Sequence, residues 1–167
     1  MSQMPLFPET SETSIGEAVL VDDAQGRIVY TPGFVPDDVA RAWFAELRLG
    51  APWKAERRFM YDREVDVPRL QAHVRLAPPD GSVPAVIRVA AAKVIAATGV
   101  PFNSVGLNFY RAGRDSVAAH SDHLDEIVGG FPIALLSLGA TRRMTIRAKD
   151  LRRRALHVDP RRAVSSS

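Results

Sequence analysis

The sequence predicts an α+β fold in which helices come first and a run of antiparallel strands follows. The chain has 167 residues, of which 46% are hydrophobic and 25% charged, the size and balance of one globular domain. Two helical patterns lie before residue 99, and alternation of apolar and polar residues begins again at residue 103. No low-complexity tract and no repeat of fixed period occurs, which excludes disordered chains and solenoids.

The first hundred or so residues combine short strands with both helices. Residues 18–21 and 27–30 indicate two strands, because the segment between them has turn chemistry. A helix is predicted over 36–50, with two aspartates suited to the positive end of its dipole. A second helix is predicted over about 84–98, and Gly99 is the expected C-terminal cap.

The strands of the predicted sheet follow from period-two patterns. Residues 53–75 indicate an interrupted strand, and residues 103–110 alternate in the same way before a turn at 111–115. Further strands are predicted over 117–119, 131–138, 144–147 and 154–158. We expect the strand 131–138 to be buried and to pair with the strand 144–147.

Composition excludes several classes of protein. Without cysteine, the chain has no disulfide, thiolate zinc site, iron–sulfur cluster or cysteine nucleophile. Its apolar stretches are far shorter than the roughly 18 residues of a membrane span. The N-terminus lacks the basic region and apolar core of a signal peptide. We therefore expect a cytoplasmic protein.

The basic charge is concentrated near the C-terminus. From Leu138 onward the chain holds nine basic and two acidic residues, whereas the whole chain has a net charge of +3. A basic stripe of this kind could contact phosphates. A solvated face or tail explains the same charge equally simply.

The triplet His120-Ser121-Asp122 is the first candidate for chemistry. Residues two apart in an extended chain share a face, so the imidazole and the carboxylate can lean to one side. Such a pair supplies two of the three ligands of a facial triad for non-haem Fe(II). A histidine–aspartate hydrogen bond in a loop is the structural alternative.

Two polar side chains precede this triplet on a strand. Asn108 and Tyr110 share one face of that strand, opposite Leu107 and Phe109, and Gly113 lies in the turn that follows. In a curled sheet these two hydrogen-bonding groups would point inwards near a metal.

Taken together, these residues resemble the AlkB family of Fe(II)- and 2-oxoglutarate-dependent dioxygenases. The matching motifs are N-x-Y-x-x-G, then H-S-D, then P-I-A-x-x-S-L-G-A-x-R, densest over 103–149 and looser at Pro68-Arg69-Leu70-Gln71. The resemblance implies a double-stranded β-helix, or jelly-roll, with the N-terminal helices bracing one side. It also implies oxidative demethylation of alkylated bases in DNA or RNA, with Fe(II) and 2-oxoglutarate.

The same resemblance implies roles for individual residues. His120 and Asp122 would be iron ligands, and Asn108 and Tyr110 would hydrogen-bond 2-oxoglutarate. Asp125 lies in the loop where relatives recognise the target base, although a solvated acidic loop is the alternative.

Arg63 is a further candidate for substrate binding. It closes a stretch in which arginines and a tyrosine alternate, Arg57, Arg58, Tyr61 and Arg63, a composition suited to stacking and phosphate contacts. An exposed irregular segment is the alternative reading of the same residues.

The chain departs from the family at its C-terminal end. The family places a second histidine ligand some fifty or more residues after the H-x-D motif, and an arginine for 2-oxoglutarate beyond it. His157 and His123 are the remaining candidates for a third ligand, and we interpret His157 as a surface or structural residue. We predict a flexible segment over 1–14, a single incomplete domain over 15–159 lacking its last core strands, and a tail over 160–167.

Three hypotheses remain open from the sequence. The first is a demethylase of alkylated nucleic acid in DNA repair. The second is a truncated, non-catalytic remnant of the same fold that binds nucleic acid or a partner weakly. The third is a 2-oxoglutarate dioxygenase with a substrate other than nucleic acid.

Overall fold

The computed structural model describes residues 16–24, 26–60, 63–78, 80–117, 129–147 and 155–158, and only the backbone at 56–60 and 63–68. The chain divides into two compact units. One comprises Met1–Ala40 with Gly139–Ser167, and the other comprises Arg41–Leu138.

The first unit contains two small antiparallel hairpins. Strands β1 (Ala18–Asp23) and β2 (Gly26–Tyr30) pair with Ala18 opposite Tyr30, and the register shifts between Val19 and Val21. These strands confirm the prediction for 18–21 and 27–30. An ion pair of 3.9 Å joins Arg27 to Asp22 at the turn, with both side chains largely exposed, so it contributes little stability.

The second hairpin of this unit corrects a predicted pairing. Strand β6 (Met144–Ile146) pairs with β7 (Leu156–Val158), with Thr145 opposite His157. We expected β6 to pair with residues 131–138. Alternation of apolar residues marks a segment that can form a strand, but it does not identify which segment hydrogen-bonds to it.

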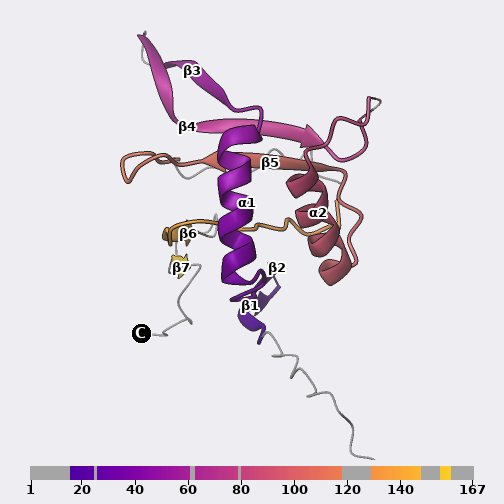
Figure 1. Cartoon of the computed structure of the whole chain (residues 1–167). Helices are drawn as coiled ribbons and strands as arrows, with labels where there is room; N and C mark the ends of the chain where they lie inside the picture. The colour runs from indigo at the N-terminus through magenta and orange to yellow at the C-terminus, as the bar shows by residue number, and fades with distance from the viewer. Residues whose placement is uncertain are drawn as a thin grey trace, which may run out of the picture. The chain divides into compact units, whose positions relative to one another are not determined.

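The second unit is built around a three-stranded antiparallel sheet in the order β3-β4-β5. These strands are β3 (Lys54–Met60), β4 (Arg63–Arg75) and β5 (Ser104–Phe109) (Figure 1). Strand β4 pairs along its C-terminal half with β5, from Leu70 opposite Phe109 to Arg75 opposite Ser104. The prediction of strands over 53–75 and 103–110 is confirmed.

Both predicted helices are present. Helix α1 (Asp37–Gly50) starts with Asp37 and Asp38, whose carboxylates favour the positive end of its dipole. Helix α2 (Ala85–Thr98) ends at Gly99, whose φ of 68° is the left-handed conformation that glycine adopts without strain. The N–H of Gly99 donates to the carbonyl of Ile95, which closes the last turn. Neither helix is long and apolar enough to span a membrane, as far as the described residues extend.

The core of the second unit lies between the helices and one face of the sheet. Val74 of β4 and Val86 and Ile87 of α2 form its buried cluster. Partly buried residues from α1, β5 and the connecting loops pack against them: Trp43, Leu47, Leu76, Val83, Val105 and Leu107. Because side chains alternate along a strand, the polar residues between these apolar ones lie on the other face of the sheet.

Residues 131–138 differ from the prediction of a buried strand. They belong to no strand, and Phe131, Ile133 and Leu135 are 49%, 60% and 68% exposed. A strand requires a neighbour that satisfies its backbone groups, and no described segment pairs with this one. Val117 is likewise outside any strand, while the rest of the predicted strand 117–119 lies beyond the described residues.

The predicted α+β class is confirmed by two helices and small antiparallel sheets. The three sheets of the described residues do not close into a barrel. The described strands therefore do not form a complete jelly-roll, which stays an expectation from the family resemblance.

The core predicts the cost of removing one side chain. Ile87 is 3% exposed, so Ile87→Ala should lower the free energy of unfolding by about 2–4 kcal/mol through lost burial and the cavity left behind. Val89 on the same helix is 52% exposed, and Val89→Ala should change it by less than about 0.5 kcal/mol. Urea denaturation of both variants measures the difference, and equal midpoints would contradict this assignment of the core.

Candidate active site

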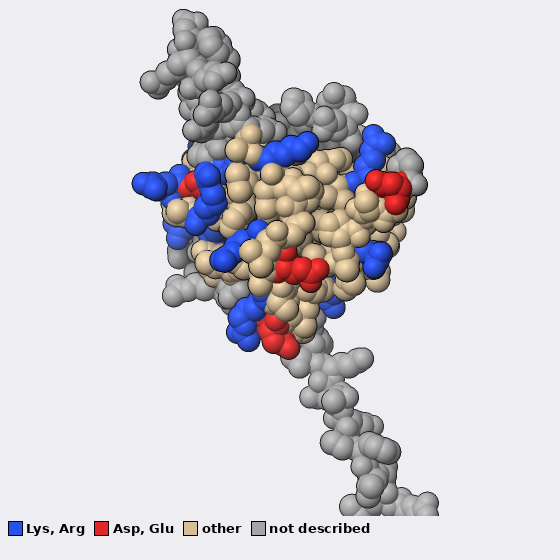
Figure 2. All heavy atoms as spheres, turned by 45° about the horizontal axis from the view of Figure 1, so that its top comes forward, with Lys and Arg blue, Asp and Glu red and all other residues tan. Residues whose placement is uncertain are grey.

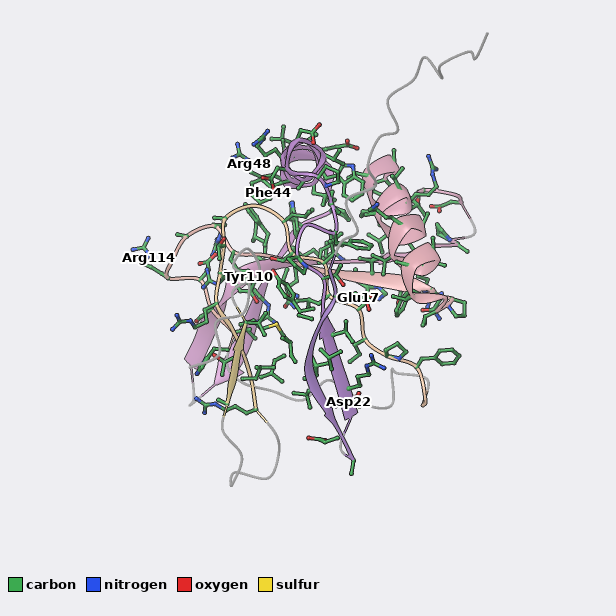
Figure 3. All side chains as sticks on the ribbon, turned by 90° about the horizontal axis from the view of Figure 1, so that it is seen from below. Glu17, Asp22, Phe44, Arg48, Tyr110 and Arg114 are labelled. Carbon is green, nitrogen blue, oxygen red and sulfur yellow. The ribbon has the colours of Figure 1, made fainter. Side chains whose placement is uncertain are left out.

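The predicted cosubstrate residues lie at the C-terminal end of β5. Asn108 is exposed and stands opposite Gln71 of β4, whereas its neighbours Leu107 and Phe109 are half-buried on the helix side. Tyr110 directly follows the strand and is half-buried (Figure 3). The alternation predicted for Leu107, Asn108 and Phe109 is therefore present, and it places Asn108 on the face turned away from the helices.

Phe109 anchors this end of β5 to the helix side of the unit. Its ring meets Phe44 of α1 edge-on, with centroids 6.1 Å apart, and meets Trp53 at 5.4 Å. The Trp53 indole Nε1 donates to the carbonyl of Leu47 at 3.0 Å, which holds the indole against the end of α1. Aromatic pairs of this geometry add stability beyond the area they bury, so the strand end that carries Asn108 is well fixed.

A hydrogen bond links the polar residues across the two strands. The Gln71 side-chain Nε2 donates to Asn108 Oδ1 at 3.2 Å. Gln71 belongs to the looser part of the family resemblance, but we predicted no role for it from the sequence. Only the register of β4 against β5 identifies Gln71, because the register decides which residue stands opposite Asn108.

A second arrangement missed by the sequence analysis lies in the turn after Tyr110. Asp115 is only 7% exposed, and its carboxylate accepts hydrogen bonds from Arg111 N at 2.8 Å, Nε at 2.9 Å and Nη2 at 3.2 Å. The Asp115 N–H donates to the Ala112 carbonyl at 3.1 Å. The turn that leads from Tyr110 towards the H-x-D motif is thus closed by a charged pair with two-point geometry.

The remaining predicted site residues are outside this cluster. His120, Asp122 and Asp125 lie beyond the described residues, as does the side chain of Arg63, whose backbone begins β4. Within the described ranges, no group of three or more histidine, aspartate or glutamate side chains could hold a metal. The roles of these residues stay predictions.

His157, considered as a substitute ligand, lies exposed on β7. Its Nδ1 is 3.1 Å from the Thr145 hydroxyl, the residue opposite it on β6. This cross-strand contact gives the imidazole a structural role in the hairpin, in keeping with our interpretation of His157 as a surface residue.

The donor chemistry on β5 fits a small carboxylic acid. An amide can present its NH₂ group, and a phenol can present its O–H, to a carboxylate oxygen. The pair Asn108 and Tyr110 could therefore orient such a molecule without supplying a charge.

Among the described residues, the lysine and arginine side chains on the face seen in Figure 2 are not gathered in one place. Lysine and arginine side chains lie around the margin of a broad uncharged area, with acidic side chains among them.

The turn after β5 predicts a test of its charged pair. Asp115→Asn keeps the shape but removes the charge and one acceptor oxygen, so we expect the free energy of unfolding to fall by about 1–2 kcal/mol. Arg114→Gln, an exposed position in the same turn whose side chain points outwards in Figure 3, should leave it unchanged. Thermal and urea unfolding compare the two variants; an Asp115→Asn protein as stable as the parent would remove the pair from the account.

Comparison with known proteins identifies the family. Residues 27–163 match the 2OG-Fe(II) oxygenase superfamily. The chain is 36% identical to human alpha-ketoglutarate-dependent dioxygenase alkB homolog 3 over 135 residues, 74% of this chain and 46% of that protein. The bovine alkB homolog 3 is 34% identical over 133 residues, with the same shares of the two chains.

A shorter similarity connects the chain to a second relative. It is 44% identical to human DNA oxidative demethylase ALKBH2 over 55 residues, which cover 33% of this chain and 21% of that protein. The aligned part of the chain spans less than half the length of the alkB homolog 3 proteins. The match over residues 27–163 covers most of the chain, from β2 to beyond β7, and includes Asn108, Tyr110 and the H-x-D motif. The chain belongs to the 2OG-Fe(II) oxygenase superfamily and resembles the AlkB proteins within it.

Proposed function

We propose that this protein oxidatively demethylates alkylated bases in DNA or RNA, using Fe(II) and 2-oxoglutarate. The observation that carries the proposal is the placement of Asn108 and Tyr110 at the end of β5, with the H-x-D segment following one turn later. Similarity to relatives whose names state alpha-ketoglutarate-dependent dioxygenase and DNA oxidative demethylase supports the reaction and the substrate class.

The metal ligands in this proposal are His120 and Asp122. A neutral imidazole and a carboxylate are ligands that suit Fe(II) and leave coordination positions open for other molecules. When bound, iron and 2-oxoglutarate would activate O₂, which is the oxidant: one oxygen atom would go to the keto acid as it becomes succinate and carbon dioxide, and the other to the N-methyl carbon, which would leave as formaldehyde. We further propose that the strands on view form part of a jelly-roll.

The residues of β5 and its turn would bind and orient the cosubstrate. Asn108 and Tyr110 donate hydrogen bonds to a carboxylate, and neither carries a charge that would compete with the metal. The Arg111–Asp115 pair holds the backbone directly after Tyr110, so the phenol starts from a fixed position. Pre-organised donors of this kind lose little conformational entropy when the cosubstrate binds.

The substrate contacts remain proposals from the sequence. Arg63 at the start of β4 would contact a phosphate, and Asp125 would accept a hydrogen bond from the target base. Base chemistry requires the nucleotide to leave the stack, so single-stranded or damaged sites are the favoured substrates. Cytoplasmic location stays a prediction as well.

The metal assignment predicts a loss of binding on substitution. His120→Ala and Asp122→Ala should each weaken Fe(II) binding by at least an order of magnitude, because a site that loses one of its few protein ligands keeps little affinity. Anaerobic titration, followed by the absorbance of the iron–2-oxoglutarate complex, measures this. His157→Ala is the matched control and should bind as the parent does; if it alone abolishes the absorbance, His157 is a ligand and our reading of it is wrong.

The reaction predicts matched products. With a methylated single-stranded oligonucleotide, succinate and formaldehyde should form in equal amounts, and the unmethylated oligonucleotide should give no formaldehyde. His120→Ala should reduce both products to background. Succinate that forms equally with either oligonucleotide would point to another substrate, and no succinate despite bound iron would favour a non-catalytic binding role.

A further inference from the structure

We propose that Gln71 is a positioning residue that orients the side-chain amide of Asn108 for 2-oxoglutarate. The inference rests on the proposed function, because it assumes that Asn108 contacts the cosubstrate. It concerns a residue with no predicted role, and it follows from the hydrogen bond between Gln71 Nε2 and Asn108 Oδ1 at 3.2 Å.

An asparagine amide has two chemically different ends that exchange by a half-turn about its terminal bond. One end is an acceptor oxygen and the other is an NH₂ donor of nearly the same shape. A carboxylate can be bound only by the donor end. An Asn108 side chain free to rotate would therefore present the wrong end for part of the time and would bind the acid more weakly.

Gln71 selects the productive orientation. Its Nε2 group is a donor, so the Asn108 oxygen turns towards β4 and the Asn108 nitrogen is directed elsewhere. Reversing the Asn108 amide alone would set two NH₂ groups against each other, so Asn108 can reverse only if the Gln71 amide reverses with it. The Gln71 hydrogen bond thus couples the orientation of Asn108 to that of Gln71.

The backbone keeps the two side chains in register. Gln71 and Asn108 are direct partners across the β4–β5 ladder, where opposite side chains lie within reach of each other. Phe109 beside Asn108 is held by Phe44 and Trp53, and Ala72 beside Gln71 is buried. A one-residue slip would turn the polar residues of the slipped strand towards the core and expose its apolar ones, so burial on the other face holds the register.

The same face of the ladder offers a control position. The next pair on this face is His73 opposite Gly106. His73 is exposed and lies on the same face and the same strand as Gln71, two ladder pairs from Asn108.

The test compares three variants by their affinity for 2-oxoglutarate. Gln71→Leu removes the hydrogen bond at similar size, and Gln71→Glu replaces the donor by an acceptor that draws the Asn108 NH₂ group towards itself. The control is His73→Leu. Isothermal titration with 2-oxoglutarate, in the presence of Mn(II) instead of Fe(II), measures the dissociation constant without turnover, and circular dichroism verifies that each variant is folded.

We expect Gln71→Leu to raise the dissociation constant about 3- to 10-fold, the value of one hydrogen bond. Gln71→Glu should raise it further, because the donor end is lost and a negative charge is added beside an acid. His73→Leu should leave it unchanged. In steady-state assays the loss should fall on KM for 2-oxoglutarate and leave kcat nearly intact.

A double-mutant cycle separates the inference from its premise. If Gln71 acts through Asn108, Gln71→Leu should add nothing in an Asn108→Ala background. Independent, additive losses would overturn the positioning role, as would unchanged affinity in both Gln71 variants while Asn108→Ala weakens binding. If Asn108→Ala itself leaves the affinity unchanged, the proposed cosubstrate site fails and the inference fails with it. A Gln71→Leu protein that does not fold is replaced by Gln71→Glu in the same cycle.

Discussion

The antiparallel pairing of β4 with β5 is the constraint on which the helix-bearing unit depends. Each strand alternates between an apolar residue that faces the helices and a polar residue that does not, so the register decides what is buried. The same register places Val74 and Leu107 against the helices and Gln71 opposite Asn108. A slip of one residue would place polar groups in the core and apolar groups outside. Burial on one face therefore positions the candidate site on the other.

The same coupling explains why the site starts where the strand ends. The Phe109 ring packs against Phe44 of α1 and against Trp53, which follows α1. Its two neighbours along the chain, Asn108 and Tyr110, are the candidate ligand-binding residues. Immediately beyond, the Arg111–Asp115 pair closes the turn through three hydrogen bonds. Packing of Phe109 thus fixes the backbone beside Asn108, and the Arg111–Asp115 pair fixes the chain after Tyr110. Neither of these contacts involves a residue that would bind the ligand.

Local signals predicted the elements well, and tertiary choices were beyond them. The helix ends at Gly99 followed from the chemistry of caps, and the strands of the central sheet followed from alternation. The segment 131–138 is an almost continuous apolar run that predicted a buried strand, yet it is exposed and unpaired among the described residues, because an apolar run does not specify a pairing partner. The link from Gln71 to Asn108 spans 37 positions and depends on register alone. Motif spacing singled out Asn108 and Tyr110, but the residues that lie beside them in space could be identified only from the structure.

The distribution of aromatic side chains has an optical consequence. Both tryptophans of the chain, Trp43 and Trp53, belong to the unit Arg41–Leu138, and Trp53 lies against Phe109 beside the candidate site. Indole emission therefore reports on that unit and is silent about the unit that contains the β1–β2 and β6–β7 hairpins. A denaturation curve followed by fluorescence and one followed by backbone dichroism will superimpose only if the two units melt together. The two tryptophans, compared with backbone dichroism, therefore test whether the two units unfold cooperatively.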